Sequence, residues 1–181
     1  DAHNHPIFAF RLHQFISKGE SVYASPEPEA DRHISLQAQQ FVPGSDRSKI
    51  LLPVAFCREC GQEYYVIRKE GGEGSPTMYH PRELTDRMDN DDGHAGFLYI
   101  NTEEPWPSDG QEVIERLPDS WIEIQGGVPR VRATRRDRLP REVFVSEDGI
   151  EGSGKLRAHY IKTPFPFCMN CGIDYGAYQR S

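Results

Sequence analysis

The four cysteines of this chain fall into two copies of one ten-residue pattern. The copies are FCRECGQEYY, from Phe56 to Tyr65, and FCMNCGIDYG, from Phe167 to Gly176. In a chain that is not secreted, paired Cys-x-x-Cys motifs are typical of zinc sites, because two intervening residues let both thiolates face one ion. We therefore expect one structural Zn²⁺ site that ties two distant segments together, with four ligands: Cys57, Cys60, Cys168 and Cys171.

Other uses of the cysteines remain open. Each pair could act alone in redox chemistry, but redox motifs of the thioredoxin type precede a helix, and the residues Tyr64–Ile67 favour a strand. Disulfides are typical of secreted chains, and the sequence shows no signal peptide. A catalytic zinc needs an open coordination position, which four thiolates do not leave. A structural zinc site is the interpretation that the pattern favours.

The segments around the cysteines have mostly strand patterns. We expect strands over 21–25, 49–56, 63–69, 95–101 and 142–149, a helix over 108–118, and a short helix over 6–18 between Pro6 and Gly19. The fold class expected is α+β and mostly β, with a zinc-ribbon-like four-cysteine core. The predicted divisions are a helical lead-in (1–20), a core (21–69 and 143–181) and a large β-rich insertion (70–142). We expect the ribbon to hold the insertion outside itself, with Trp121, Ile122 and Ile124 packed on the sheet.

Composition narrows the function classes. The chain has 181 residues and a net charge of −7, whereas a free-standing nucleic-acid-binding protein is usually basic. No apolar run approaches the roughly 18 residues needed to span a membrane, so we expect a cytoplasmic protein without membrane contact. Because the sequence starts at Asp1 instead of Met, we expect it to be part of a longer protein.

Positive charge is nevertheless concentrated in one stretch, PRVRATRRDRLPR. Arginine grips phosphate with a bidentate fork, so this cluster could follow a nucleic-acid backbone. The alternative is a charged face that pairs with the acidic residues Asp86, Asp89, Asp91, Asp92, Glu103 and Glu104. The candidate nucleic-acid contacts are Arg130, Arg132, Arg135, Arg136, Arg138 and Arg141.

Two further motifs are weak. The stretch GIEGSGKL, Gly149–Leu156, resembles a phosphate-binding loop but lacks the final Ser or Thr that would bind magnesium, so we expect a glycine-rich hairpin loop. The stretch DNDDGH, from Asp89 to His94, lacks the glutamate and flanking helices of a calcium loop. No paired carboxylates or nucleophile–base set can be placed, so we expect no enzymatic activity of this chain by itself.

The stretches FAFRLHQFISKGESVYAS and ISLQAQQFVPGSDRSKILLPVAFCRECGQEYYVI resemble the accessory zinc-binding region of large bacterial superfamily 2 helicases of the DEAD/DEAH-box type. The resemblance covers roughly residues 7–67 and the second cysteine motif at 165–176. It implies a parent protein that uses ATP to move along or remodel DNA, and it assigns the four cysteines as zinc ligands. It carries no ATP-binding or catalytic residue onto this chain.

Two functions follow as hypotheses. The first is an accessory zinc domain of a DNA helicase that contacts or guides DNA. The second is a zinc-stabilised interaction module that docks to the motor domains of the parent chain, or to another partner, without binding nucleic acid. The arginine stretch discriminates between them: the first requires those side chains to be open, and the second requires them to pair with acidic residues.

Overall fold

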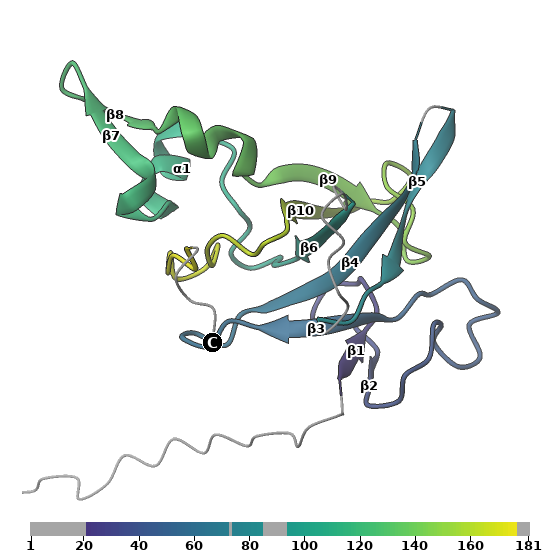
Figure 1. The fold of residues 1–181 in the computed structure, drawn as a ribbon. Helices are drawn as coiled ribbons and strands as arrows, with labels where there is room; N and C mark the ends of the chain where they lie inside the picture. Colours follow the sequence, from purple (N-terminus) through teal and green to yellow (C-terminus); the bar gives the residue numbers. More distant parts are fainter. Residues whose placement is uncertain (1–20, 73, 85–93, 177–181) are drawn as a thin grey trace, which may run out of the picture.

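The computed structural model describes residues 21–72, 74–84 and 94–176 (Figure 1). The helix expected over 6–18 lies outside these ranges. Strands are the main regular structure of the described residues, beside one α-helix and two short 3₁₀ turns, which confirms the β-rich α+β class. The helical elements are α1 (Gly110–Arg116), η1 (Asp119–Trp121) and η2 (Ala133–Arg138).

Eight strands form one antiparallel sheet in the described part. Its strands follow the order β2-β1-β3-β4-β6-β10-β9, and β5 pairs with the far end of β4. The strand bounds are β1 (Val22–Ala24), β2 (Ile34–Ser35), β3 (Leu52–Phe56), β4 (Glu63–Gly72), β5 (Ser75–Pro81), β6 (Ala95–Tyr99), β9 (Arg141–Val145) and β10 (Leu156–Lys162). A separate two-stranded hairpin consists of β7 (Ile122–Gln125) and β8 (Val128–Val131).

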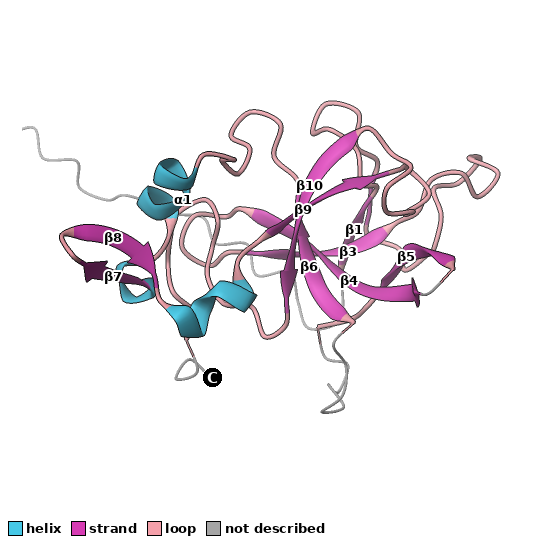
Figure 2. Ribbon diagram, turned by 90° about the horizontal axis from the view of Figure 1, so that it is seen from above, coloured by secondary structure: helices cyan, strands magenta, loops and turns pink. Residues whose placement is uncertain are grey.

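The sheet curves until its far strands approach each other. Beyond β4, strand β5 forms a bridge from Met78 to Ile150, and the next residue, Glu151, bridges to Val145 of β9. Because β9 is the last strand on the other side, these bridges connect the two ends of the path β4-β6-β10-β9. The curved sheet thereby takes on a barrel-like arrangement, in which Figure 2 shows the strands tilted against one another.

Successive side chains of a strand point to opposite sides. Each central strand buries both of its faces, because a cluster of buried residues lies on each side of it. Tyr65 and Ile67 of β4 face the inside of the curved sheet, and Tyr64 and Val66 face the cysteines. We call the first cluster the barrel core: Ala24, Ile50, Leu52, Tyr65, Ile67, Tyr79, Leu98, Ile100, Val143, Val145, Ala158 and Tyr160. The second is the metal-side core: Cys57, Tyr64, Val66, Phe97, Tyr99, Trp106, Leu117, Trp121, Ile161, Phe167, Cys168 and Met169.

From the sequence we expected the segment 70–142 to lie outside the ribbon, and this expectation was wrong. Its strand β6 lies between β4 and β10 in the middle of the sheet, with Val66 opposite Phe97 and Ile161 opposite Phe97 on the other side. All five residues of β6 are buried, which explains their continuous apolar character. The metal-side core and the barrel core therefore both depend on this segment.

Part of the segment does leave the sheet. Figure 1 shows the β7–β8 hairpin projecting beside α1, away from the strands. Its turn uses Gly126 and Gly127, both with positive φ, as two-residue hairpins require. Trp121 is fully buried and Ile122 packs partly on the metal-side core. Ile124, which we expected to pack on the sheet, is instead 70% exposed, because the hairpin carries it beyond the core.

No helix in the described ranges is long and apolar enough to cross a membrane.

Candidate metal centre

Both cysteine motifs fold into the same tight turn. In the first, Gly61 donates its backbone N–H to the Cys57 carbonyl at 2.9 Å, and in the second Gly172 donates to the Cys168 carbonyl at the same distance. The two glycines have φ angles of 80° and 70°, a region that side chains disfavour. The repeated glycine in the sequence pattern is thus explained by the turn that presents each pair of sulfurs.

The turns bring all four sulfur atoms together. The Sγ atoms of Cys57, Cys60, Cys168 and Cys171 all lie within 4.8 Å of one another. Cys57 Sγ lies 3.8 Å from Cys171 Sγ, and Cys60 Sγ lies 3.7 Å from Cys168 Sγ. Four thiolates arranged tetrahedrally at about 2.3 Å from one ion would lie about 3.8 Å apart. The donor set and its spacing therefore fit a single metal ion, and the four cysteines predicted as ligands are the ones assembled.

The repeated tyrosine has a role that the sequence analysis missed. Tyr64 of the first motif accepts the Met169 N–H at 2.7 Å, and its hydroxyl lies 3.2 Å from Cys168 Sγ. Tyr175 of the second motif accepts the Arg58 N–H at 3.2 Å, and its hydroxyl lies 3.2 Å from Cys57 Sγ. The hydroxyl of each tyrosine thus contacts the sulfur of the first cysteine in the opposite motif. The signal was its fixed position in both copies of the pattern.

The surroundings shift the pKa values of three of the cysteine thiols in different directions. Burial raises the pKa of Cys168 well above its ordinary value, and burial also raises the pKa of Cys171. Burial acts the same way on Cys57, but hydrogen bonds from the Tyr175 hydroxyl and from backbone N–H groups outweigh it and lower the Cys57 pKa to about 7. A metal ion binds the thiolate form, so binding releases protons and weakens as the pH falls.

The two motifs differ in how their leading phenylalanines are covered. Phe167 is fully buried, with its ring centroid 4.8 Å from that of Trp121 and 5.8 Å from that of Trp106. Phe56, at the matching position of the first motif, is 54% exposed. The α1–η1 segment, which covers one copy of the motif, has no counterpart over the other within the described ranges.

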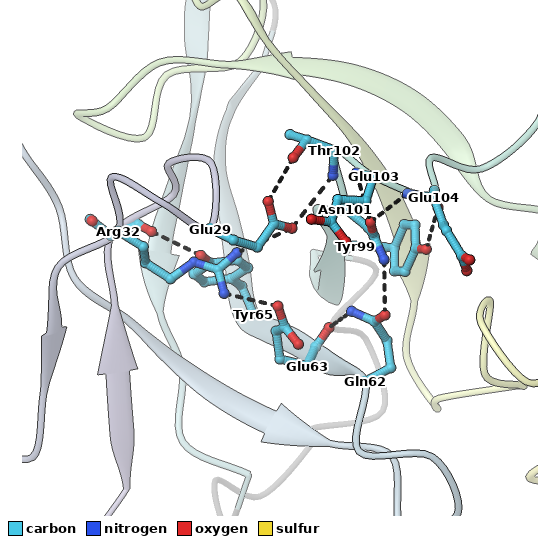
Figure 3. A network of polar contacts seen from close by, with 11 residues as sticks. Glu29, Arg32, Gln62, Glu63, Tyr65, Tyr99, Asn101, Thr102, Glu103 and Glu104 are labelled. Atoms are coloured by element: carbon cyan, nitrogen blue, oxygen red, sulfur yellow. Dashed lines mark hydrogen bonds and ion pairs between the residues drawn. The ribbon is translucent and has the colours of Figure 1, made fainter.

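A polar network supports the residues that follow the turn of the first motif (Figure 3). Arg32 donates to the Glu63 carboxylate at 2.9 Å and lies 3.9 Å from Glu29. Asn101, just beyond β6, donates to the Gln62 side chain at 3.2 Å. Because Gln62 and Glu63 directly follow the glycine of the turn, this network fixes the turn to two distant loops.

Five of the six candidate arginines lie on β8, on η2 or, for Arg132, at the residue between the two. None of the five is within ion-pair distance of a carboxylate in the part of the chain that the structure describes. We call this the arginine segment: Arg130, Arg132, Arg135, Arg136 and Arg138. Arg130 donates to the Gln125 side chain and Arg136 to the Val131 carbonyl, both at 3.3 Å. Arg135 lies 5.3 Å from the centre of the Trp121 ring.

Arg141 is placed differently. Its guanidinium donates to Glu151 at 2.8 Å, and the same carboxylate accepts from Lys69 at 3.0 Å and from the Tyr79 hydroxyl at 2.6 Å. Of the acidic residues that we considered as partners for the arginines, Asp86, Asp89, Asp91 and Asp92 lie outside the described residues. Glu103 and Glu104, which are described, form no ion pair with any of the six candidate arginines, all of which lie in the described ranges.

No protein-family model matches this chain, and no curated protein or solved structure matches it either.

Proposed function

We propose that this chain is a zinc-stabilised module that binds nucleic acid through the arginine segment, and that it acts as an accessory domain of a larger DNA helicase. The observation that carries the proposal is the set of five arginines without carboxylate partners in the described ranges, in a chain with a net charge of −7. Such a local excess of cations on an acidic protein favours an anionic partner.

Zinc is the metal that the donor set favours. Four sulfur ligands in a tetrahedral arrangement are typical of zinc or of iron bound to sulfur, and zinc predominates in structural sites with two Cys-x-x-Cys motifs. Elemental analysis of the purified protein tests this. We expect one zinc per chain and no visible absorbance, whereas an iron signal with a coloured protein would contradict the assignment.

The place of the module in a helicase rests on the sequence resemblance. In that arrangement the motor domains of the parent chain hydrolyse ATP, and this module contacts the DNA that they move. The hairpin and η2 present the arginine segment at the end of the molecule that projects from the sheet (Figure 1).

One observation favours a second function. Ile124 and Val128, near the turn of the β7–β8 hairpin, are 70% and 51% exposed. In the hairpin register Ile124 pairs with Pro129 and Val128 with Gln125, so the two apolar side chains are exposed on opposite faces of the hairpin, where a protein partner that contacts both faces would bury them. The hairpin could therefore dock to the motor domains of the parent chain, with the arginines at the rim of that contact.

DNA binding distinguishes the two functions. We would titrate the zinc-loaded chain into labelled single-stranded and duplex DNA at two salt concentrations and follow the anisotropy. The variant Arg132→Glu/Arg136→Glu should bind more weakly, with the salt slope for single strands reduced by about 0.7 per lost phosphate contact. The matched control is Arg47→Glu/Lys155→Glu, which reverses two exposed cations outside the arginine segment.

The result of this titration decides between the DNA-binding function and the docking function. Salt-dependent binding that the first variant loses and the control variant keeps supports the DNA-binding function. Equal losses in both variants indicate a nonspecific effect of net charge and contradict the role of the arginine segment. Absence of binding to either form of DNA by the zinc-loaded wild type contradicts the proposal and favours the docking function.

A further inference from the structure

The internal repeat makes one surface feature unusual. Two copies of the motif place a phenylalanine directly before the first cysteine, and in the second copy two tryptophan rings cover it. In the first copy, Phe56 lies 54% exposed at the end of β3. A ring at the same position of the same turn is therefore covered in one half of the site and open in the other.

Phe56 borders a small apolar pocket of about 140 Å³. The walls are mostly aromatic: Tyr64, Phe97, Phe165 and Tyr175 line it together with Ala55, Cys57, Arg58 and Leu84. Phe165 meets Phe97, Tyr64 and Tyr175 edge-on, with ring centroids 5.0, 4.8 and 5.3 Å apart. The volume is well below the roughly 300–1,000 Å³ of clefts for drug-sized ligands, so the pocket suits a single flat group.

The rim of the pocket carries a positive charge. Arg58 is exposed, and its guanidinium has no carboxylate within ion-pair distance among the residues that the structure describes. Its backbone N–H is held by Tyr175, so the residue is anchored while its side chain is open to solvent. The pocket thus combines an aromatic surface with a cation beside it, which matches a base attached to a phosphate.

We propose that Phe56 and this pocket receive one unstacked base of a nucleic-acid strand, with Arg58 contacting an adjacent phosphate. The inference rests on the proposed nucleic-acid binding and adds a base contact to the phosphate contacts of the arginine segment. Aromatic side chains beside cations are the usual means of holding single strands without sequence preference. The base takes the place that the tryptophans occupy over Phe167.

A strand without bases tests the contact directly. We would measure binding of the zinc-loaded chain to labelled oligothymidylate and to an abasic strand of the same length, which has the same phosphates. We expect wild type to prefer the strand with bases. Phe56→Ala should weaken binding of that strand about tenfold or more and leave binding of the abasic strand unchanged. Phe56→Trp, which keeps a ring, should retain the preference.

Controls exclude indirect effects. Phe144→Ala removes a ring that is 43% exposed on β9 and should not alter the preference, and zinc content must be equal in all variants. Arg58→Gln should weaken both strands equally. Salt-dependent binding with no preference for bases, or a preference that Phe56→Ala keeps, overturns this inference alone and assigns the exposed ring to a protein partner. Absence of binding to both strands overturns the proposed function as well.

Discussion

The crossed tyrosines connect the two halves of the metal centre at the level of single atoms. Each hydroxyl accepts a backbone N–H from the opposite motif and lies beside the first sulfur of that motif. Hydrogen bonds of this kind orient metal ligands and stabilise their charge. The position of the first sulfur in each motif is therefore set by a residue that belongs to the other motif.

Removal of one hydroxyl should weaken metal binding. Tyr64→Phe leaves the buried Met169 N–H without its acceptor and Cys168 Sγ without its hydroxyl contact. We expect a loss of about 10–100-fold in zinc affinity, measured by competition with a chromogenic chelator. Tyr65→Phe is the matched control, because its hydroxyl donates to the Ser25 carbonyl in the barrel core. Equal affinities for the two variants would contradict the role of Tyr64.

His159 makes stability depend on pH. Its side chain lies in β10 and is only 4% exposed, and burial, together with the charge of Arg157, lowers its pKa to about 4. An unfolded histidine has a pKa of about 6.5. Between these values the unfolded chain takes up a proton that the folded chain does not, so stability falls by up to about 1.4 kcal/mol per pH unit as the pH drops from about 6.5 to about 4.

Denaturant unfolding across this pH range tests the effect. His159→Gln should give a shallower decline of unfolding free energy below pH 6.5 than wild type, and the same pH dependence above it. The control, His33→Gln, changes an exposed histidine and should preserve the wild-type slope. A His159→Gln profile parallel to that of wild type would show that this imidazole does not contribute.

At the scale of the elements, the contact between β6 and β10 requires a glycine. A Cβ at Gly96 would lie 2.3 Å from a ring carbon of Tyr160 and 2.6 Å from the Ile161 carbonyl oxygen. Gly96→Ala should therefore destabilise the protein by about 1–3 kcal/mol, measured by thermal unfolding. Gly110→Ala at the start of α1, where a Cβ meets nothing within 4 Å, is the control and should be neutral. Equal melting temperatures would contradict the close approach of the two strands.

Most elements were predictable because each had a local signal. Strands β1, β3, β4, β6 and β9 lie where apolar stretches predicted them, and α1 begins after Asp109, whose side chain caps it. Strand β5 and the β7–β8 hairpin were missed. The glycines at positions 71, 72 and 74 give no strand signal around the β4–β5 turn, and the Gly126–Gly127 pair was not recognised as a hairpin turn although it separates two short apolar segments.

At the scale of the whole molecule, the four-cysteine cluster joins residues 108 positions apart, and a metal bound there would hold them together. The two tryptophans of the chain, Trp106 and Trp121, both lie in the metal-side core. Removal of zinc with a strong chelator should shift tryptophan emission to longer wavelength and make the chain sensitive to protease, because a structural site contributes about 10 kcal/mol or more of folding free energy. Restoring zinc should reverse both changes.

The control for this measurement is the addition of calcium in place of zinc. Calcium prefers oxygen ligands, so it should restore neither signal. Unchanged tryptophan emission and unchanged protease resistance after complete zinc removal would show that the sheet alone holds the metal-side core.

The overall arrangement was the part that the sequence could least predict. The cluster of four cysteines followed from their spacing, but the order of the strands depends on contacts between segments far apart in the chain. Nothing local to Ala95–Tyr99 indicates that this strand lies between β4 and β10. Whether the arginines of the arginine segment form ion pairs likewise depends on which acidic residues the fold places near them.

The crossed tyrosines also have a consequence for synthesis of the protein. The first cysteine pair leaves the ribosome 108 residues ahead of its partners, a delay of about 5–20 s at ordinary elongation rates. During that interval Cys57 and Cys60 are without Cys168 and Cys171, which would complete the ligand set, and Cys57 also lacks the hydroxyl of Tyr175. The nascent chain must pass through a period in which its first two thiols are open to oxidation, and that period ends only when the last strand and the second motif have been made.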